Sequence, residues 1–227
     1  MSTFLIESLQ HALHLMLDCS FQNGQPADGK EGRPVARKKE FDVETALERA
    51  RDAFWAEGYE ATSMDLLLKR MGINRGSFYD TFKSKRDVLI KALRLYDSRN
   101  RASLLRHVSQ GRSPREAISA IFHGMIDGSR GPQGRHGCFL VNSALEVAPK
   151  DVEVARIVRD GFRDVEQFFA ELIRQGQRSG EFRKELDAEK LGRTLMSQLV
   201  GLLVLVRAGA SKPTLKTLVQ QASDLLT

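Results

Sequence analysis

The sequence TSMDLLLKRMGINRGSFYDTFKSKRD, residues 62–87, decides the fold that we expect for this chain. Its first half carries an apolar stripe at helical spacing, made by Met64, Leu67, Leu68 and Met71. This stripe predicts a short helix, and Thr62 with Asp65 predicts a capping box at its start. Gly72 can end that helix in the left-handed conformation, and Asn74 can cap a second helix after a turn of about three residues. Two helices joined by so short a turn cross steeply, as in a helix-turn-helix.

The second helix is predicted from about Asn74 to Thr81. It is too short to bury itself, so we expect its large apolar neighbours to anchor it: Ile73, Phe78 and Phe82. The remaining side chains would form an outer face: Arg75, Gly76, Ser77 and Tyr79. Arginine and serine can donate to base edges or phosphates, glycine allows close approach of the backbone, and tyrosine adds a hydroxyl on a flat ring. This outer face suits a DNA groove, and Asn74 at the start of the helix is a further candidate DNA contact.

A second capping box, Ser84 with Asp87, opens the next helix and places Lys83 and Lys85 near its N-terminus. Main-chain amides and positive charge both favour a phosphate at such a position. The same geometry is also compatible with a purely structural helical hairpin, because any helical domain contains short turns.

The string GINRGSFYDTFKSKRDVL, with GYEATSM before it, resembles the helix-turn-helix signature of TetR-type transcriptional regulators, from Phe41 to about Leu89. The resemblance implies an all-helical homodimer whose small N-terminal domain binds operator DNA and whose larger C-terminal domain binds an inducer. The positions that match DNA contacts of the motif are Thr62, Arg75, Gly76, Ser77, Tyr79 and Lys85, and those that match its core are Phe78 and Phe82. The chain departs from the family pattern at Leu68 and Met71, where alanine is usual, and at Asn74, where Ser or Thr is commoner.

The chain has 227 residues, of which 41% are hydrophobic and 28% are charged, and its net charge is +6. These values suit a globular chain with one small and one larger domain, and they exclude disordered and fibrous classes. Cys19 and Cys138 are too few for a disulfide framework and match no zinc spacing, so we expect a cytoplasmic protein without metal or cofactor. No strand pattern appears, and the predicted fold class is all-α.

The chain divides into four predicted parts. Residues 1–31 form an N-terminal extension and flexible linker, which has no signal-peptide pattern and too short an apolar stretch to span a membrane. Residues 32–40 form a basic arm in which Arg33, Arg37, Lys38 and Lys39 suit an A·T-rich minor groove, with a solvated linker as the alternative. Residues 41–86 are the DNA-binding domain, and residues 87–227 are the ligand-binding and dimerisation domain.

The C-terminal domain is predicted to be a helical bundle. One helix, from Ser84 to about Gln110, would join it to the DNA-binding head as a rigid lever. Further helices are predicted over residues 113–128, 138–147, 151–178, 187–208 and 213–226. The last two are apolar on more than one face, which predicts an intersubunit four-helix bundle. Its interface residues would be Leu195, Leu199, Leu202, Leu203, Val206, Leu215, Leu218, Val219 and Ala222.

Large, adaptable side chains in the bundle indicate a pocket for a small apolar or electrophilic molecule. The candidate residues are Phe122, His123, Met125, Cys138, Phe139, Asn142, Phe168 and Phe169, although ordinary packing explains most of them equally well. Cys138 begins a helix behind Arg135 and His136, which would favour a thiolate that reacts with quinones or aldehydes. The alternative is a passive thiol in the core or the pocket.

Enzyme motifs are absent from the sequence, which contains no P-loop, G-x-G-x-x-G, G-x-S-x-G or H-E-x-x-H string. Cys138, His136 and Asn142 resemble a Cys/His/Asn set only superficially, because no third group is placed to orient the histidine. The prediction is therefore a dimeric transcriptional regulator, a repressor that an inducer releases from a palindromic operator, with no membrane partner. The alternative is a helical adaptor whose basic head binds an acidic protein.

Overall fold

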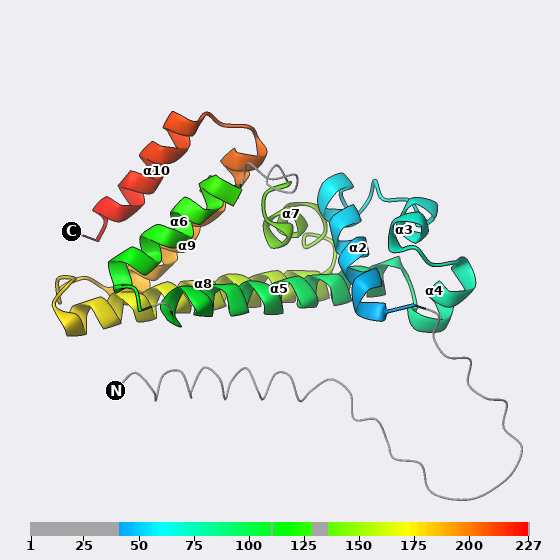
Figure 1. The fold of residues 1–227 in the computed structure, drawn as a ribbon, viewed down its shortest axis with the longest axis horizontal. Helices are drawn as coiled ribbons and strands as arrows, with labels where there is room; N and C mark the ends of the chain where they lie inside the picture. The colour runs from blue at the N-terminus through cyan, green and yellow to red at the C-terminus, as the bar shows by residue number, and fades with distance from the viewer. Residues whose placement is uncertain (1–40, 110, 129–135, 227) are drawn as a thin grey trace, which may run out of the picture. The chain divides into compact units, whose positions relative to one another are not determined.

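The computed structural model describes residues 41–109, 111–128 and 136–226. These residues form nine helices and no strand, so the all-α fold is confirmed (Figure 1). The helices are α2 (Val43–Glu57), α3 (Met64–Met71), α4 (Arg75–Thr81), α5 (Lys85–Ser109), α6 (Pro114–Gly128), α7 (Phe139–Glu146), α8 (Val152–Ser179), α9 (Ala188–Arg207) and α10 (Lys212–Asp224). The predicted extension and basic arm, with Arg33, Arg37, Lys38 and Lys39, lie outside the described residues, as does Arg135.

Local capping signals account for where the helices of the head begin and end. Asp42 caps α2 by accepting from the backbone N–H groups of Glu44 and Thr45. Gly72 ends α3 in the left-handed conformation, with φ of 72°, and Asn74 caps α4 by accepting from the Ser77 N–H at 2.8 Å. These features confirm the predicted end of the first helix and start of the second.

Thr62 was expected to cap α3, and this prediction is wrong. Ser63 is the cap, because its Oγ accepts from the Leu66 N–H at 3.2 Å. The Thr62 hydroxyl instead donates to the Gly58 carbonyl at 2.6 Å, and the residue is fully buried. The two neighbouring hydroxyls therefore have different roles: Ser63 caps α3, and Thr62 fixes the turn that precedes it.

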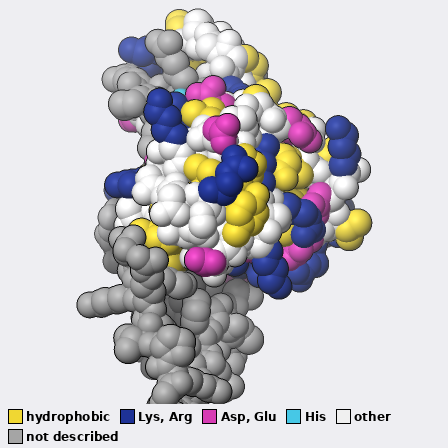
Figure 2. Space-filling model, turned by 90° about the vertical axis from the view of Figure 1, so that its right-hand side faces the viewer, with side chains coloured by type: hydrophobic (Ala, Val, Ile, Leu, Met, Phe, Trp, Pro, Cys, Tyr) yellow, Lys and Arg dark blue, Asp and Glu magenta, His cyan; other side chains and the backbone are white. Residues whose placement is uncertain are grey.

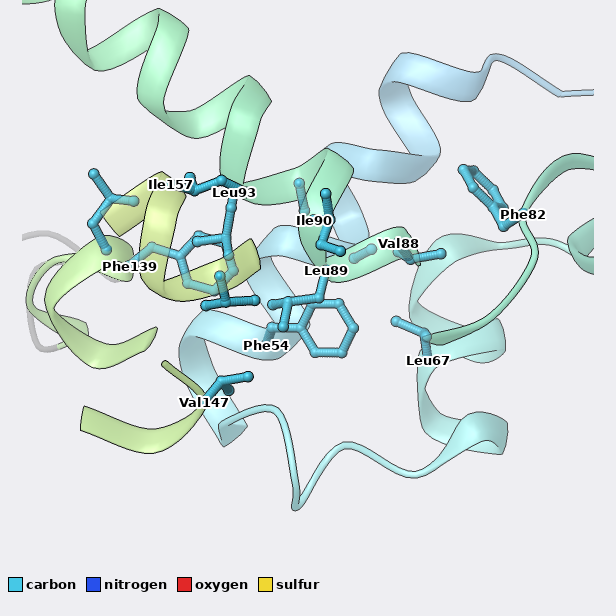
Figure 3. Packing of buried hydrophobic residues seen from close by; sticks show 14 of the residues in the cluster. Phe54, Leu67, Phe82, Val88, Leu89, Ile90, Leu93, Phe139, Val147 and Ile157 are labelled. Carbon is cyan, nitrogen blue, oxygen red and sulfur yellow. The ribbon is translucent and has the colours of Figure 1, made fainter. Parts of the chain in front are cut away.

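One apolar cluster runs through the head and into the bundle. In Figure 3, Phe54, Leu67 and Phe82 from the head converge on the first turns of α5. Phe139, Val147 and Ile157, from α7 and α8 and the turn between them, belong to the same cluster. The head and the start of the bundle therefore share a continuous core, with α5 passing through it.

A second cluster holds the distal part of the bundle together. It is built from α6, α8, α9 and α10, and its fully buried members include Ile118, Ile173 and Leu195. Because α8 contributes to both clusters and packs beside α5, these two long helices form the axis of the described fold (Figure 1). None of the helices in the described part of the chain is long and apolar enough to span a membrane.

Seven of the nine residues predicted for the dimer interface are buried within their own subunit, so that part of the prediction is wrong. They are Leu195, Leu199, Leu202, Val206, Leu215, Val219 and Ala222. The inner faces of α9 and α10 pack on α8 and α6 of the same chain, which accounts for much of their apolarity. Leu203 and Leu218 are half-buried, and the large apolar side chains that α9 exposes are Val204 and Leu205.

The close approach of α8 and α9 depends on Gly192. A Cβ at this position would lie 2.7 Å from the backbone oxygen of Glu166. We therefore expect Gly192→Ala to lower the free energy of unfolding by about 1–3 kcal/mol, because a backbone cannot yield as a side chain can. Urea unfolding followed by circular dichroism measures this change.

Gly124→Ala is the matched control, because nothing lies within 4 Å of the added methyl group on α6. Alanine is the better helix former, so this variant is expected to gain roughly 0.5–1 kcal/mol. Equal effects of the two substitutions would show that α8 and α9 do not pack as closely as described.

Candidate nucleic-acid interface

The outer face of α4 points away from the apolar core. Phe78 is fully buried beneath it, whereas Arg75 and Gly76 are exposed and Ser77 is half-buried. Tyr79 is 55% exposed, with its ring edge-on to Phe78 at 5.2 Å between centroids. Figure 2 faces this end of the fold and shows Lys and Arg side chains among apolar and acidic ones. The outer face predicted from the sequence is therefore present and accessible.

Arg75 forms an ion pair with Asp65, which the sequence does not indicate as part of the site. Its Nη2 lies 2.8 Å from Oδ1 of Asp65, on the first turn of α3. Both side chains are exposed, so the pair adds little stability, but it gives the guanidinium one preferred place beside α4. The sequence indicates only a capping role for Asp65, because nothing local pairs it with a residue on the next helix.

Ser84 caps α5 as the sequence predicts, but the Asp87 carboxylate accepts from the Lys83 N–H and not from the Ser84 N–H that a capping box uses. The Asp87 N–H donates to Ser84 Oγ at 3.1 Å, and the Lys83 N–H donates to Asp87 Oδ2 at 3.2 Å. Lys83 is exposed beside this helix start, where a phosphate oxygen would meet both amides and positive charge.

Lys85 and Thr62 differ from the exposed residues of the site. The Lys85 ammonium lies 4.4 Å from the centroid of the Tyr59 ring, and partial burial lowers its pKa against the opposing effect of Glu60 and Glu146. A phosphate contact from Lys85 would require its side chain to leave the ring. Thr62 offers no surface to DNA at all, so its predicted contact is wrong.

Polar contacts also join the start of α5 to α8. Arg86 donates to both carboxylate oxygens of Asp151, the N-cap of α8, with Nη2 at 2.9 Å from Oδ1. This hydrogen bonding holds the pKa of Asp151 down at about 2, so the carboxylate is charged at neutral pH. The Arg86 guanidinium therefore binds the bundle through Asp151 and is not placed to bind a ligand.

The predicted ligand residues do not gather in one place. Phe122, Met125, Phe168 and Phe169 belong to the distal cluster, where the Phe122 and Phe169 rings stack at 6.0 Å. Cys138 and Phe139 lie in the other cluster, with Asn142 on the same helix, and His123 is exposed. A surface depression of about 410 Å³ is lined by Arg174, Gln177, Arg178 and Lys184, none of which was predicted.

Cys138 is not the activated thiol that its place before α7 suggested. It is only 8% exposed, and the Tyr96 hydroxyl donates to its sulfur at 3.5 Å. Burial raises the pKa of the thiol, and this desolvation outweighs the favourable hydrogen bonds at the helix start. The prediction of a stabilised thiolate is therefore wrong, and the passive alternative fits. Asn142 donates to the His136 carbonyl at 2.8 Å, so these three residues form no catalytic set.

The protonated, buried state of Cys138 has a measurable consequence. In a chain carrying Cys19→Ser, alkylation of Cys138 by iodoacetamide at neutral pH should be at least about tenfold slower in the folded protein than in denaturant, because reaction requires local opening. Phe139→Ala, which removes a neighbouring buried ring, should speed the reaction. Alkylation of the folded chain as fast as the denatured one would contradict this description of the thiol.

Comparison with known proteins gives matches over both halves of the chain. Residues 46–92 match the model of the bacterial regulatory proteins of the tetR family, and residues 114–222 match the tetracyclin repressor-like C-terminal domain. The HTH-type transcriptional regulator YezE of Bacillus subtilis is 33% identical, covering 85% of this chain and all of its own. The HTH-type transcriptional repressor ComR of Escherichia coli K12 is 27% identical, covering 84% of this chain and 90% of its own.

Solved structures share the fold. The regulator CifR, solved in complex with a 26-base-pair double-stranded operator, superposes with a TM-score of 0.74 at 27% identity, covering 83% of this chain and 98% of its own. The reduced form of Escherichia coli NemR gives a TM-score of 0.74 at 18% identity, covering 81% of this chain and 96% of its own. At that identity the likeness to NemR concerns the fold alone.

Proposed function

Because the chain belongs to the TetR family of helix-turn-helix transcriptional regulators, we propose that it is a repressor that binds a palindromic operator as a homodimer and is released by a small molecule. The family consists of DNA-binding regulators, and the chain is not an enzyme. Its place of action would be the cytoplasm, where its DNA partner lies.

The observation that carries this proposal is the exposed face of α4, with Arg75 at its start and Lys83 beyond its end. A helix anchored by Phe78 and bare on its opposite side can enter a major groove without unfolding anything else. In a symmetric dimer, two such helices would meet half-sites about one helical turn of DNA apart. The basic arm, with Arg33, Arg37, Lys38 and Lys39, would add minor-groove contacts. The relative ComR is named a transcriptional repressor, which supports repression as the mode of regulation here.

Arg75 and Lys83 should differ in what they contribute to binding. Arg75→Ala is expected to weaken binding to an operator selected from a random duplex library by about 1–3 kcal/mol. It should also relax the preference for particular base pairs, because a base contact is lost. Lys83→Ala should weaken binding to all duplexes alike, because a phosphate contact is lost. The slope of the logarithm of the binding constant against the logarithm of the salt concentration should fall in magnitude by about one.

Fluorescence anisotropy on selected and scrambled duplexes over a range of salt concentrations measures both effects. Equal affinity of the unmodified chain for the two duplexes would rule out specific readout. Tighter binding to an acidic protein than to any duplex would favour the adaptor alternative instead.

The outward face of α9 is the proposed dimer surface. Val204 is 42% exposed and Leu205 is 36% exposed. Ser197, Gly201 and Ala208 are exposed at helical spacing on the same side. Leu218 on α10, which is half-buried and belongs to the interface residues predicted from the sequence, would join this surface. A face that combines small and branched apolar residues allows two helices to approach closely.

Val204→Glu is expected to weaken the dimer by at least about tenfold in Kd, because association would bury a charge without a partner. Val152→Glu is the matched control, since it replaces a valine that is 83% exposed at the start of α8. Sedimentation velocity measures the two variants, and a monomeric unmodified chain at micromolar concentration would contradict the proposal.

The inducer would bind near one of two aromatic groups: Phe122 with Phe169 inside the bundle, or Trp55 with Tyr96 where the head meets the bundle. Either group offers large side chains that can rearrange around an apolar molecule. To release DNA, the inducer must bind the DNA-incompetent form better, by about 1.4 kcal/mol for each tenfold loss of operator affinity.

A further inference from the structure

Glu146, the last residue of α7, reaches across to the DNA-binding head. Its carboxylate accepts two backbone hydrogen bonds, from the Tyr59 N–H at 3.0 Å and from the Glu60 N–H at 2.8 Å. These amides belong to the turn between α2 and α3. Hydrogen bonds to a carboxylate are stronger than bonds between neutral groups. One side chain of the bundle therefore fixes the turn from which the helix-turn-helix begins.

Gly58 makes this contact possible. It ends α2 with φ of +94°, and a Cβ there would lie only 3.2 Å from one carboxylate oxygen of Glu146 and 3.3 Å from the other. The Lys85 ammonium, held over the Tyr59 ring, adds positive charge beside Glu60 and Glu146. The turn, the carboxylate and the lysine thus form one compact polar group at the junction.

The opposite end of α7 is tied to α9. The carbonyl of His136 accepts from Trp55 Nε1 on α2 at 3.1 Å, from Asn142 Nδ2 at 2.8 Å and from Arg207 Nη1 at 3.1 Å. The added Cβ of a residue at Gly137 would lie 3.3 Å from the backbone oxygen of Leu203, so this loop approaches α9 closely. Because α7 has only eight residues, it connects α9 to the head as a short, stiff element.

From this geometry we infer that Glu146 is a positioning residue for DNA binding, which sets the angle of each head relative to α9 and hence the half-site separation that a dimer accepts. The inference rests on the proposed function, because it assumes two heads on one palindrome. The apolar cluster and the Arg86–Asp151 pair also attach the head. Loss of the Glu146 contact should therefore leave the head folded and attached but less strictly oriented.

The test is selection of binding sites from a random duplex library by three forms of the full chain: unmodified, Glu146→Gln and Glu171→Gln. Glutamine keeps the size of the side chain but removes its charge and replaces one acceptor oxygen with a donor. Glu171→Gln is the matched control, because Glu171 bonds Arg174 and Arg178 within α8 and not the head. Affinities for the selected palindrome are then measured with its half-sites moved apart or together by one base pair.

We expect the unmodified chain and Glu171→Gln to prefer one spacing by at least about fivefold, and Glu146→Gln to lose most of that preference while still selecting the same half-site. A spacing preference unchanged in Glu146→Gln overturns the inference. A uniform loss of affinity without a change in spacing preference also overturns it, since that pattern indicates a merely structural role. If the unmodified chain selects no palindrome, the proposed function fails and the inference fails with it.

Amide exchange measured by NMR gives a second test that does not depend on DNA. The amides of Tyr59 and Glu60 should exchange faster in Glu146→Gln than in the unmodified chain, while the amides of Phe78 and Leu89 in the head core keep their rates. Unchanged exchange at Tyr59 and Glu60 would show that Glu146 does not hold this turn, whatever the outcome of the selection.

Discussion

The packing of the first turns of α5 against the head is the constraint on which the rest of the structure depends. Val88, Leu89 and Ala92 are fully buried there, in contact with a cluster that includes Phe54 and Phe78. Burying side chains of the size of Val or Leu stabilises by roughly 1.5–3 kcal/mol each, whereas an exposed ion pair contributes about 0–1 kcal/mol. Apolar packing therefore holds the head on the bundle, and it leaves the outer face of α4 free for another molecule.

The polar contacts at the junction have a different role. The bonds from Glu146 to the turn after α2 and from Arg86 to Asp151 are partly exposed, which reduces their contribution to stability relative to the buried apolar cluster. They are directional, however, and each joins the head to a different helix of the bundle. Movement of α7 or α8 would reach the head through these contacts without unfolding its core, which is the kind of link that a regulated DNA-binding protein requires.

The sequence predicts best what neighbouring residues decide. Asn74 caps α4 and Gly72 ends α3 as expected, because each acts within one turn of its own position. Thr62 and Ser63 were harder to tell apart, since both can cap, and the choice depends on where the Gly58 carbonyl lies. The face of α4 was also predictable, because Phe78 anchors it and its exposed neighbours follow from helical spacing.

Features decided by distant parts of the chain were mispredicted or missed. The apolar pattern of Leu195 or Val219 is the same whether a second subunit or α6 and α8 cover it, and the fold covers it from within. The helix start favours a Cys138 thiolate, but burial reverses that effect. The ion pair of Asp65 with Arg75 and the hydrogen bond from the Tyr59 N–H to Glu146 form only when folding brings separate helices together.

The structure of the full chain bound to its selected operator duplex tests the central claim most directly. The account predicts α4 in the major groove, the Arg75 guanidinium within hydrogen-bonding distance of a base edge, and the amides of Tyr59 and Glu60 still bonded to Glu146. A complex in which α4 faces away from the DNA, with the duplex lying on another surface such as the Arg174 and Arg178 end of α8, would contradict it.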